Sequence, residues 1–330
     1  MIILNEAEIR GLVDAEAARL AIASAFRALH RGEATLPSVI SVPFRAPEGV
    51  AHVKAGHLHD DAVWTVKISA DFDPGDGSAT LHSGMMLVVS ATDGTLGAVL
   101  VDNGFLTELR TGAAGAIAAE LLARDDVSTA AIVGAGSQAR FQLAALLNVR
   151  PIDSVRVASR SRERARAFVD EIQATHGLSA QLCDSVEEAV RGAGIVVTTT
   201  QSTSPLLEAD WIEKGTHVTA VGSDEPGKQE LAPAVLARAD VVAVDDRSQT
   251  ARFGELHHAI DSGDRSQEDV VTLGELLDGA AQGRGSADEI TVADLTGVGV
   301  QDAAIAALVM RRAVAAQAEQ LGSRSARTAS

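Results

Sequence analysis

The spacing of apolar and polar residues changes along the chain from a helical to a strand-like pattern. Residues 14–31 carry apolar side chains at helical spacing, which predicts an amphipathic helix. From 37 to 101 the chain reads as short alternating runs separated by turn residues, with 85–89 and 96–101 flanking a plausible hairpin turn at Thr92-Asp93-Gly94. This part of the sequence predicts a mostly antiparallel sheet.

An Ala-rich run over residues 107–123 predicts a helix capped by Thr107. After Thr129 the pattern becomes strand, helix, strand, which is typical of a parallel, doubly wound sheet. The expected strands are 129–133, 154–158, 194–199, 217–221, 240–244 and 289–293. A last helix is expected from about Gln301, and we expect it to return to the first domain.

These patterns predict an α/β protein with two domains. A Rossmann-type doubly wound parallel sheet domain covers residues 125–300, and residues 1–124 with 301–330 form a mixed, mostly antiparallel α+β domain. The length of 330 residues also fits two domains better than one.

Composition excludes several classes of function. Cys183 is the single cysteine, so there is no internal disulfide and no cysteine-based metal site; we expect it to be a small buried side chain. The nine histidines lack metal-ligand spacing, and no metal is predicted. A net charge of −17 argues against general nucleic-acid binding.

The first residues carry early acids and no long apolar run, so we expect no signal peptide. No stretch reaches the ~18 apolar residues of a membrane span. The expected location is the cytoplasm, without a membrane or nucleic-acid partner.

A glycine-rich turn follows the strand at 129–133. Gly134 permits the tight turn, and Gly136 lets the backbone approach a pyrophosphate. A helix starts there, and its free N–H groups favour phosphate binding. We therefore predict that Gly134, Ala135, Gly136, Ser137 and Gln138 bind a dinucleotide. The alternative is a glycine turn that serves only packing.

The second strand indicates which dinucleotide is bound. NAD binding favours a carboxylate about 20 residues after the glycine turn, where this chain has Ser159. Together with Arg160 and Arg162, this serine predicts binding of a 2′-phosphate, hence NADP, with NAD also possible. A solvated basic turn is the alternative.

Small polar residues end the next two strands at the same edge of the sheet. Thr198, Thr199 and Thr200 follow one strand, and Val221-Gly222 with Asp224 follows the other. We predict that the threonines and Gly222 contact the cofactor and that Asp224 lies at the crevice mouth. Turn or capping roles are the alternatives.

Two cations precede the Rossmann-type domain. Lys67 lies in an apolar strand and faces either solvent or a cavity, and Arg110 lies in the first turn of the Ala-rich helix. Either residue is alternatively a surface charge.

Several motifs in order resemble the ornithine cyclodeaminase/μ-crystallin family over nearly the whole chain. The matching stretches are Thr65–Lys67, Asp102–Thr111, Gly134–Ala139, Val221–Leu231 and Asp294–Asp302. The segment Gly254–Ile260 is most similar to the branch linked to ectoine utilisation and iminosuccinate reduction.

The resemblance implies a homodimer built through the domain of residues 1–124 and 301–330, with a small amino or imino acid held between the two domains. It also implies that Lys67 and Arg110 contact the substrate and that Asp224 is an acid/base or orients the nitrogen. Val221, Gly299 and Val300 are implied to lie near the nicotinamide. The family commonly has an arginine for the substrate carboxylate where this chain has Val39, so Arg45 and Lys54 are proposed substitutes.

The leading hypothesis is NAD(P)-dependent hydride transfer at the Cα–N bond of a small amino or imino acid, by an imino-acid reductase or amino-acid dehydrogenase. An alternative is a cyclodeaminase that uses bound NAD⁺ without net redox change. A further alternative is a μ-crystallin-like, NADP-dependent binding protein. The sequence does not name the substrate side chain.

Overall fold

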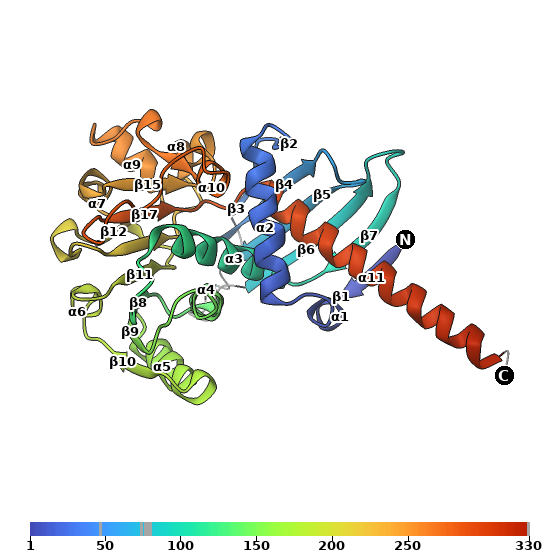
Figure 1. Cartoon of the computed structure of the whole chain (residues 1–330), viewed down its shortest axis with the longest axis horizontal. Helices are drawn as coiled ribbons and strands as arrows, with labels where there is room; N and C mark the ends of the chain where they lie inside the picture. The colour runs from blue at the N-terminus through green and yellow to red at the C-terminus, as the bar shows by residue number, and fades with distance from the viewer. Residues whose placement is uncertain (46–47, 73–74, 76–80, 329–330) are drawn as a thin grey trace. The chain divides into compact units, whose positions relative to one another are not determined.

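The computed structural model describes residues 1–45, 48–72, 75 and 81–328, and the chain forms two compact units (Figure 1). Unit 1 comprises Met1–Arg110 and Gly299–Ser330, and unit 2 comprises Thr111–Val298. The first boundary lies inside a helix, fourteen residues before the expected boundary after residue 124, because the second half of that helix packs into the core of unit 2 through Ala119.

Unit 1 is built on a mixed sheet. Its elements are β1 (Ile2–Asn5), α1 (Glu6–Arg10), α2 (Ala15–His30), β2 (Ala34–Thr35), β3 (Ile40–Arg45), β4 (Glu48–Leu58), β5 (Val63–Phe72), β6 (Leu81–Ser90), β7 (Leu96–Val101), the start of α3 (Phe105–Leu122) and α11 (Gly299–Thr328).

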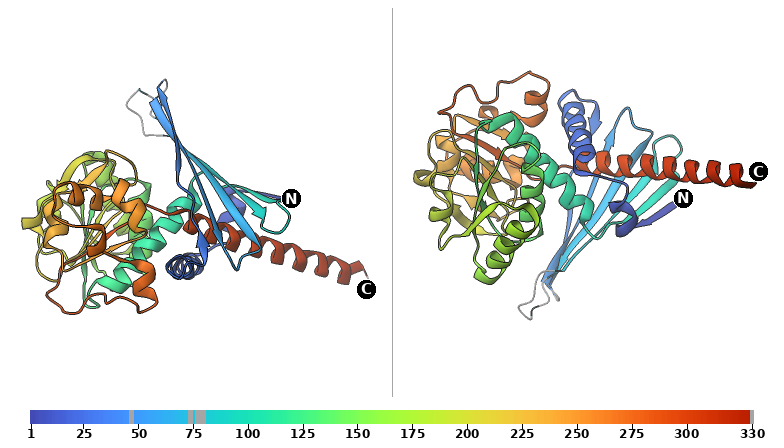
Figure 2. Two further views of the ribbon diagram at one scale, coloured as in Figure 1. Left: turned by 90° about the horizontal axis from the view of Figure 1, so that it is seen from above. Right: turned by 60° about the horizontal axis from the view of Figure 1, so that its bottom comes forward.

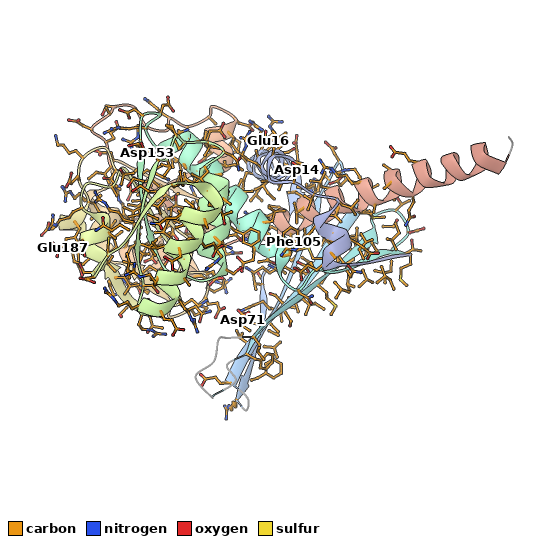
Figure 3. The ribbon with its side chains drawn as sticks, turned by 90° about the horizontal axis from the view of Figure 1, so that it is seen from below. Asp14, Glu16, Asp71, Phe105, Asp153 and Glu187 are labelled. Carbon is orange, nitrogen blue, oxygen red and sulfur yellow. The ribbon has the colours of Figure 1, made fainter. Side chains whose placement is uncertain are left out.

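The strand order in unit 1 is β1-β7-β6-β5-β4-β2, with β3 also paired to β4. Among the described residues of this sheet, only the pair of β1 with β7 is parallel, so the expectation of a mostly antiparallel sheet is confirmed. Helices α2 and α11 pack against each other and lie on one face of this sheet (Figure 2). Asp14 caps α2 by accepting the backbone N–H of Ala17 (Figure 3).

Two helices in unit 1 begin earlier than predicted. The prediction that Thr107 caps α3 is wrong: the helix begins at Phe105, because the buried Asp102 carboxylate accepts the N–H of Leu106. Helix α11 begins at Gly299, two residues earlier than expected. A Cβ atom on Gly299 would lie 2.2 Å from the Ala55 carbonyl oxygen of β4, so only glycine permits this close packing of helix and strand.

Unit 2 contains all the remaining described elements and the rest of α3, from Thr111 on. They are β8 (Thr129–Val133), α4 (Ser137–Leu146), β9 (Ser154–Ala158), α5 (Arg162–His176), β10 (Ser179–Leu182), α6 (Val186–Val190), β11 (Ile195–Thr198), β12 (Thr203–Leu207), η1 (Ala209–Trp211), β13 (His217–Ala220), β14 (Gln229–Leu231), α7 (Pro233–Arg238), β15 (Val241–Val244), α8 (Arg247–Phe253), α9 (Glu255–Asp261), η2 (Gln267–Asp269), β16 (Val271–Thr272), α10 (Leu273–Leu277) and β17 (Thr291–Asp294).

The main sheet of unit 2 is entirely parallel, in the order β10-β9-β8-β11-β13-β17-β15-β16. Two apolar cores lie on its opposite faces, one including α4 and α5 and the other including α6, α7 and α9. The predicted doubly wound Rossmann-type sheet is confirmed. The chain reverses direction of winding between β8 and β11, where such folds bind ligands at the carboxyl ends of the strands.

Among the described residues, no helix combines the length and the hydropathy needed to cross a membrane.

Candidate functional site

The glycine turn after β8 has the backbone geometry of a dinucleotide loop. Gly134 has a φ of 120°, and a Cβ atom there would lie 2.4 Å from Oγ1 of Thr199, so a side chain is excluded both by conformation and by space. A Cβ on Gly136 would instead meet open space, which leaves the backbone accessible. Ala139, three residues after Gly136 in helix α4, is fully buried.

Helix α4 begins directly at this loop. Its N-cap is Gly136, and no side chain caps the helix. The start of the helix, at Ser137 and Gln138, carries the positive end of the helix dipole, which favours an anion there. The guanidinium of Arg140 holds the loop by donating to the carbonyl oxygens of Ala135 and Gly136. These residues fit the pyrophosphate of a dinucleotide.

In the basic turn after β9, Ser161 and Arg162 have structural partners. Ser161 caps α5 by accepting the N–H of Arg164, and Arg162 forms an ion pair with Asp184. Ser159 is partly buried at the strand end, and Arg160 is exposed. No acidic residue occupies positions 159–162, so this turn offers hydroxyl and guanidinium groups but no carboxylate.

A buried glutamate joins the loops that follow β11 and β13. Glu230 is fully buried, and its Oε2 accepts hydrogen bonds from Thr198 Oγ1 at 2.7 Å and from the Gly222 N–H at 2.8 Å. Its Oε1 accepts the Thr200 N–H at 2.5 Å. Thr199 donates its N–H to the Val133 carbonyl oxygen, which ties the same loop to β8. Three of the predicted cofactor residues, Thr198, Thr200 and Gly222, therefore share Glu230 as an anchor.

Two more buried carboxyl groups continue this network. Glu255 accepts the N–H groups of Glu230 and Leu231 at 2.7 and 3.0 Å, and Asp294 Oδ2 accepts the Leu256 N–H at 2.8 Å. Burial, and then the charge of Asp294, raise the pKa of Glu255 to about 9. Burial likewise raises the pKa of Asp294 to about 8 and also raises that of Glu230.

The Asp294→Asn variant should gain stability relative to the native chain as pH rises from 5 to 8. In the folded protein the pKa of Asp294 lies above the ordinary value of 3.8, so folding favours the protonated carboxyl. Protonated Asp294 therefore contributes fully to the stability of the native chain below about pH 4, and this contribution is lost as pH rises toward 8. The difference should grow by roughly 1 kcal/mol per pH unit, measured by urea unfolding. Asp170→Asn, on an exposed site of α5, is the control; a difference independent of pH would contradict the prediction.

Asp224 lies in the loop after β13 and is not isolated. Its Oδ1 accepts from Lys228 Nζ at 2.7 Å, and the same ammonium lies 3.3 Å from a Glu225 carboxylate oxygen. Burial opposes the charge of Lys228, but the two carboxylates outweigh it and raise the pKa of Lys228. The Asp224 side chain is 41% exposed, so its carboxylate remains open to solvent while it is held in place.

Unit 1 contains a buried cluster of charged side chains. Lys54 and Lys67 lie directly opposite each other on β4 and β5 and share the helix-covered face of the sheet. Asp302 on α11 contacts Lys67 Nζ at 3.3 Å through Oδ2, and Arg110 Nε at 3.2 Å through Oδ1. Gln301 Oε1 accepts from Arg110 Nη1 at 3.2 Å. The structure therefore brings three of the predicted cations together.

The ionisation of Lys67 is shifted by this environment. Burial is the main cause that lowers the pKa of Lys67 to about 7, and the charges of Arg110 and Lys54 lower it further, while Asp302 opposes them. Burial acts to raise the pKa of Asp302, but Lys67, Arg110 and Lys54 outweigh it and hold that pKa low. Lys67 thus binds or releases a proton near neutral pH, as a general acid or base must.

Other predicted site residues lie elsewhere. Arg45 is exposed at the end of β3 and pairs in register with Glu48 of β4. Glu48 is six residues from Lys54 on the same strand, a distance of about 20 Å. It does not join the cluster, because the register of the hairpin carries it away. Gly299 and Val300 are buried in unit 1 at the start of α11, and Val221 is buried in unit 2 just after β13.

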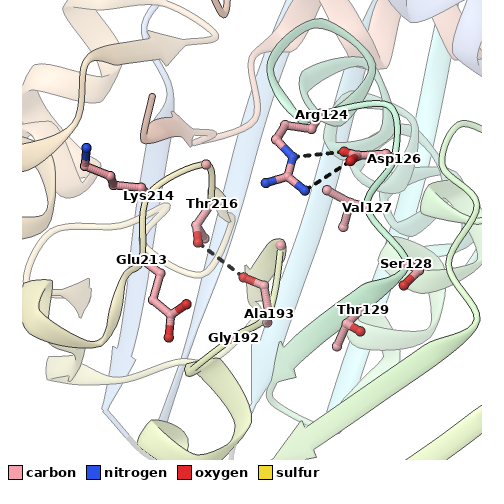
Figure 4. A pocket seen from close by; sticks show the side chains of 12 residues that line it. Arg124, Asp126, Val127, Ser128, Thr129, Gly192, Ala193, Glu213, Lys214 and Thr216 are labelled. Atoms are coloured by element: carbon pink, nitrogen blue, oxygen red, sulfur yellow. Dashed lines mark hydrogen bonds and ion pairs between the residues drawn. The ribbon is translucent and has the colours of Figure 1, made fainter. Parts of the chain in front are cut away.

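A hollow of about 210 Å³ lies at the opposite, amino-terminal edge of the parallel sheet in unit 2 (Figure 4). Some of its polar groups already have partners: Arg124 pairs with Asp126, and Thr216 donates to the Ala193 carbonyl oxygen. Ligands of such sheets bind at the other edge, so this hollow is not part of the site. In the part of the chain that the structure describes, no group of three or more His, Cys, Asp or Glu side chains is arranged to hold a metal ion.

Several residues of these clusters were not singled out from the sequence: Asp302, Gln301, Glu230, Glu255, Asp294 and Lys228. A signal for Asp302 exists, because it is a carboxylate set between the apolar stretches 298–300 and 303–309. A charge inside such a run is expected to have a buried partner.

Comparisons with known proteins cover the whole fold. A model described as the ornithine cyclodeaminase/mu-crystallin family matches residues 1–317. An uncharacterized cyclodeaminase of Sinorhizobium fredii is 44% identical over 95% of this chain and 96% of its own. An archaeal alanine dehydrogenase dimer solved with NAD is 36% identical, covers 96% and 97% of the two chains, and has a TM-score of 0.89. The iminosuccinate reductase of Paracoccus denitrificans, solved with NAD⁺, is 31% identical over 96% and 97%, with a TM-score of 0.87.

Proposed function

Because the chain belongs to the ornithine cyclodeaminase/mu-crystallin family, we propose that it transfers hydride at the Cα–N bond of a small amino or imino acid with a nicotinamide dinucleotide. The observation that carries this proposal is the buried cluster of Lys67, Arg110 and Asp302 in unit 1. Unit 2 supplies a glycine loop that fits the dinucleotide.

The roles of the residues follow from their charges. Arg110 and Lys54 bind the carboxylate of the substrate, for which a guanidinium offers two parallel hydrogen bonds. Lys67 holds or releases a proton at the substrate nitrogen, and a protonated imine is the better hydride acceptor. Asp224, fixed by Lys228, orients that nitrogen. When bound, the nicotinamide supplies or accepts the hydride.

A substrate panel tests this function. The purified protein is mixed with cyclic imino acids, with 2-keto acids plus ammonia or methylamine, and with ornithine, in the presence of reduced or oxidised cofactor. We expect imino-acid-dependent loss of absorbance of the reduced nicotinamide. Release of ammonia from ornithine without net change in the cofactor would instead establish a cyclodeaminase, the activity named for the Sinorhizobium relative. Cofactor binding without any turnover would establish a binding protein.

We also propose that NADP is the preferred cofactor. Support comes from Ser159 and Arg160 at the end of β9, where a carboxylate would serve NAD. The two solved relatives described above were determined with NAD or NAD⁺. Arg162 is paired with Asp184, so Arg160 is the guanidinium that carries this proposal.

Arg160→Ala should weaken NADPH binding about tenfold and leave NADH binding unchanged, because only the 2′-phosphate would contact this guanidinium. Fluorescence titration with both cofactors measures the change. Arg166→Ala, exposed farther along α5, should affect neither cofactor. Tighter NADH than NADPH binding by the native protein would reverse the assignment.

We further propose a homodimer formed through the face of the unit 1 sheet that lies opposite α2 and α11. Support comes from in-register apolar rows on that face, such as Ile40, Val53, Ile68 and Met85 across β3 to β6. Ile40 is 59% exposed and Met85 39%. Contiguous apolar surface of this kind is typical of an interface between subunits.

Leu87→Asp should convert the dimer to a monomer, because the residue lies in the next apolar row, between Val66 and Val99, and a charge would be desolvated in the interface. Size-exclusion chromatography with light scattering measures the mass. Leu20→Asp, on an exposed position of α2, should remain dimeric. A native protein that is monomeric at micromolar concentration would exclude this interface.

A further inference from the structure

Asp302 links the two residues on which the proposed chemistry depends. Its side chain is 1% exposed, and its two oxygens are divided between Lys67 on β5 and Arg110 on α3. The neighbouring Gln301 accepts from the same guanidinium. The close packing of Gly299 on β4 fixes the start of α11. The backbone that carries Asp302 into the cluster therefore has little freedom to move.

We propose that Asp302 is the positioning residue that holds Lys67 and Arg110 in their working arrangement and sets the protonation state of Lys67. This inference rests on the proposed function, in which Lys67 handles the proton and Arg110 the carboxylate. It assigns to Asp302 a role through these two residues, without a contact to substrate.

The charges around Lys67 show why the Asp302 carboxylate has a large effect on its protonation. Lys54 on β4 and Arg110 on α3 oppose its protonated form, whereas Asp302 on α11 favours it. Asp102, after β7, also lies near enough to act on Lys67, but burial raises its own pKa, and its oxygen is engaged by the Leu106 N–H. Without Asp302, three cations would share a dry site with little negative charge to balance them.

The coupling between Asp302 and Lys67 works in both directions. Asp302 Oδ2 is buried and has no hydrogen-bond partner among the described residues, so the Lys67 ammonium is its compensating group. Deprotonation of Lys67 would leave that oxygen buried beside a neutral amine, which is unfavourable. Asp302 therefore stabilises protonated Lys67, while burial and the other cations keep the proton exchangeable.

Lysine titration by NMR tests this directly, because the chain has only four lysines: Lys54, Lys67, Lys214 and Lys228. With ¹³C-labelled lysine, the Lys67 resonance is identified by its absence in Lys67→Met and should titrate near pH 7 in the native protein. Asp302→Asn should lower that midpoint by about one pH unit or more, and Asp302→Glu should restore most of the shift. The pH profile of kcat/KM should move in parallel with the NMR midpoint.

Two further variants supply a control and a second test of the proposal. Asp102→Asn, the matched buried control, should move the midpoint much less than Asp302→Asn. Gln301→Glu adds a carboxylate beside Arg110 and should raise the midpoint, which provides a test even when Asp302→Asn does not fold. An unmoved Lys67 midpoint in folded Asp302→Asn or Gln301→Glu overturns the proposal. The titration needs no substrate, so an inactive protein in the substrate panel would reject the proposed function separately.

Discussion

Replacing Lys67 with methionine should lower kcat for imino-acid reduction about 10²- to 10⁴-fold, the usual contribution of a positioned proton donor. Methionine has a similar length and no charge, so the buried site stays filled. Dinucleotide binding should survive, because the glycine loop lies in the other unit. Steady-state kinetics and cofactor titration measure the two quantities independently.

Native activity in the reductive direction should fall as pH rises through about 7, because only protonated Lys67 can donate a proton. Lys67→Met should lack this limb of the pH profile. Lys214→Met, at a lysine whose side chain is 76% exposed, should behave as the native protein. If Lys67→Met loses cofactor binding together with activity, Lys67 is a structural residue and the proposed proton transfer is wrong.

Glu230→Ala should destabilise the protein by roughly 3–9 kcal/mol and weaken dinucleotide binding. The substitution removes the acceptor of three donors, namely Thr198 Oγ1 and the N–H groups of Thr200 and Gly222. Each buried donor left without a partner costs about 1–3 kcal/mol. Urea unfolding gives the stability, and fluorescence titration gives the affinity for the cofactor.

Glu230→Gln separates packing from hydrogen bonding. The amide keeps the size of the side chain and one acceptor oxygen, so we expect a smaller loss than for alanine. Glu163→Ala, on an exposed position of α5, controls for loss of a glutamate as such. Unchanged cofactor affinity in a destabilised Glu230→Ala protein would show that the network holds the fold but does not shape the cofactor loops.

Much of the fold was predictable because its signals are local. The strand bounds 129–133 and 154–158 agree with β8 and β9, since apolar runs followed by turn residues specify a buried parallel strand. The glycine turn was predictable for the same reason, because Gly134 needs its positive φ whatever surrounds it. Helix starts were less accurate: α3 begins before Thr107 because the capping carboxylate comes from Asp102.

The members of the charged cluster were predictable in part. Lys67 was singled out, but whether it faced solvent or a cavity remained open, because strand alternation is the same in both cases. Arg110 was also singled out, but its place in the first turns of a helix left a surface charge as the alternative. From the sequence, Arg45 and Lys54 were equally good candidates to bind the substrate carboxylate. The register of β3 with β4, however, leaves Arg45 exposed at the far end of the hairpin. Register depends on pairing between strands, which residue spacing alone does not specify.

By itself, the sequence determined the α/β class, the glycine turn after β8 and the family, because these depend on periodicity and on residues adjacent in the chain. The tertiary structure alone decided that Asp302 meets Arg110, 192 residues away, and that Glu230 anchors loops from two other strands. Such contacts require packing to bring distant segments together and to exclude water, and only then does a charge such as that of Lys67 change its proton affinity.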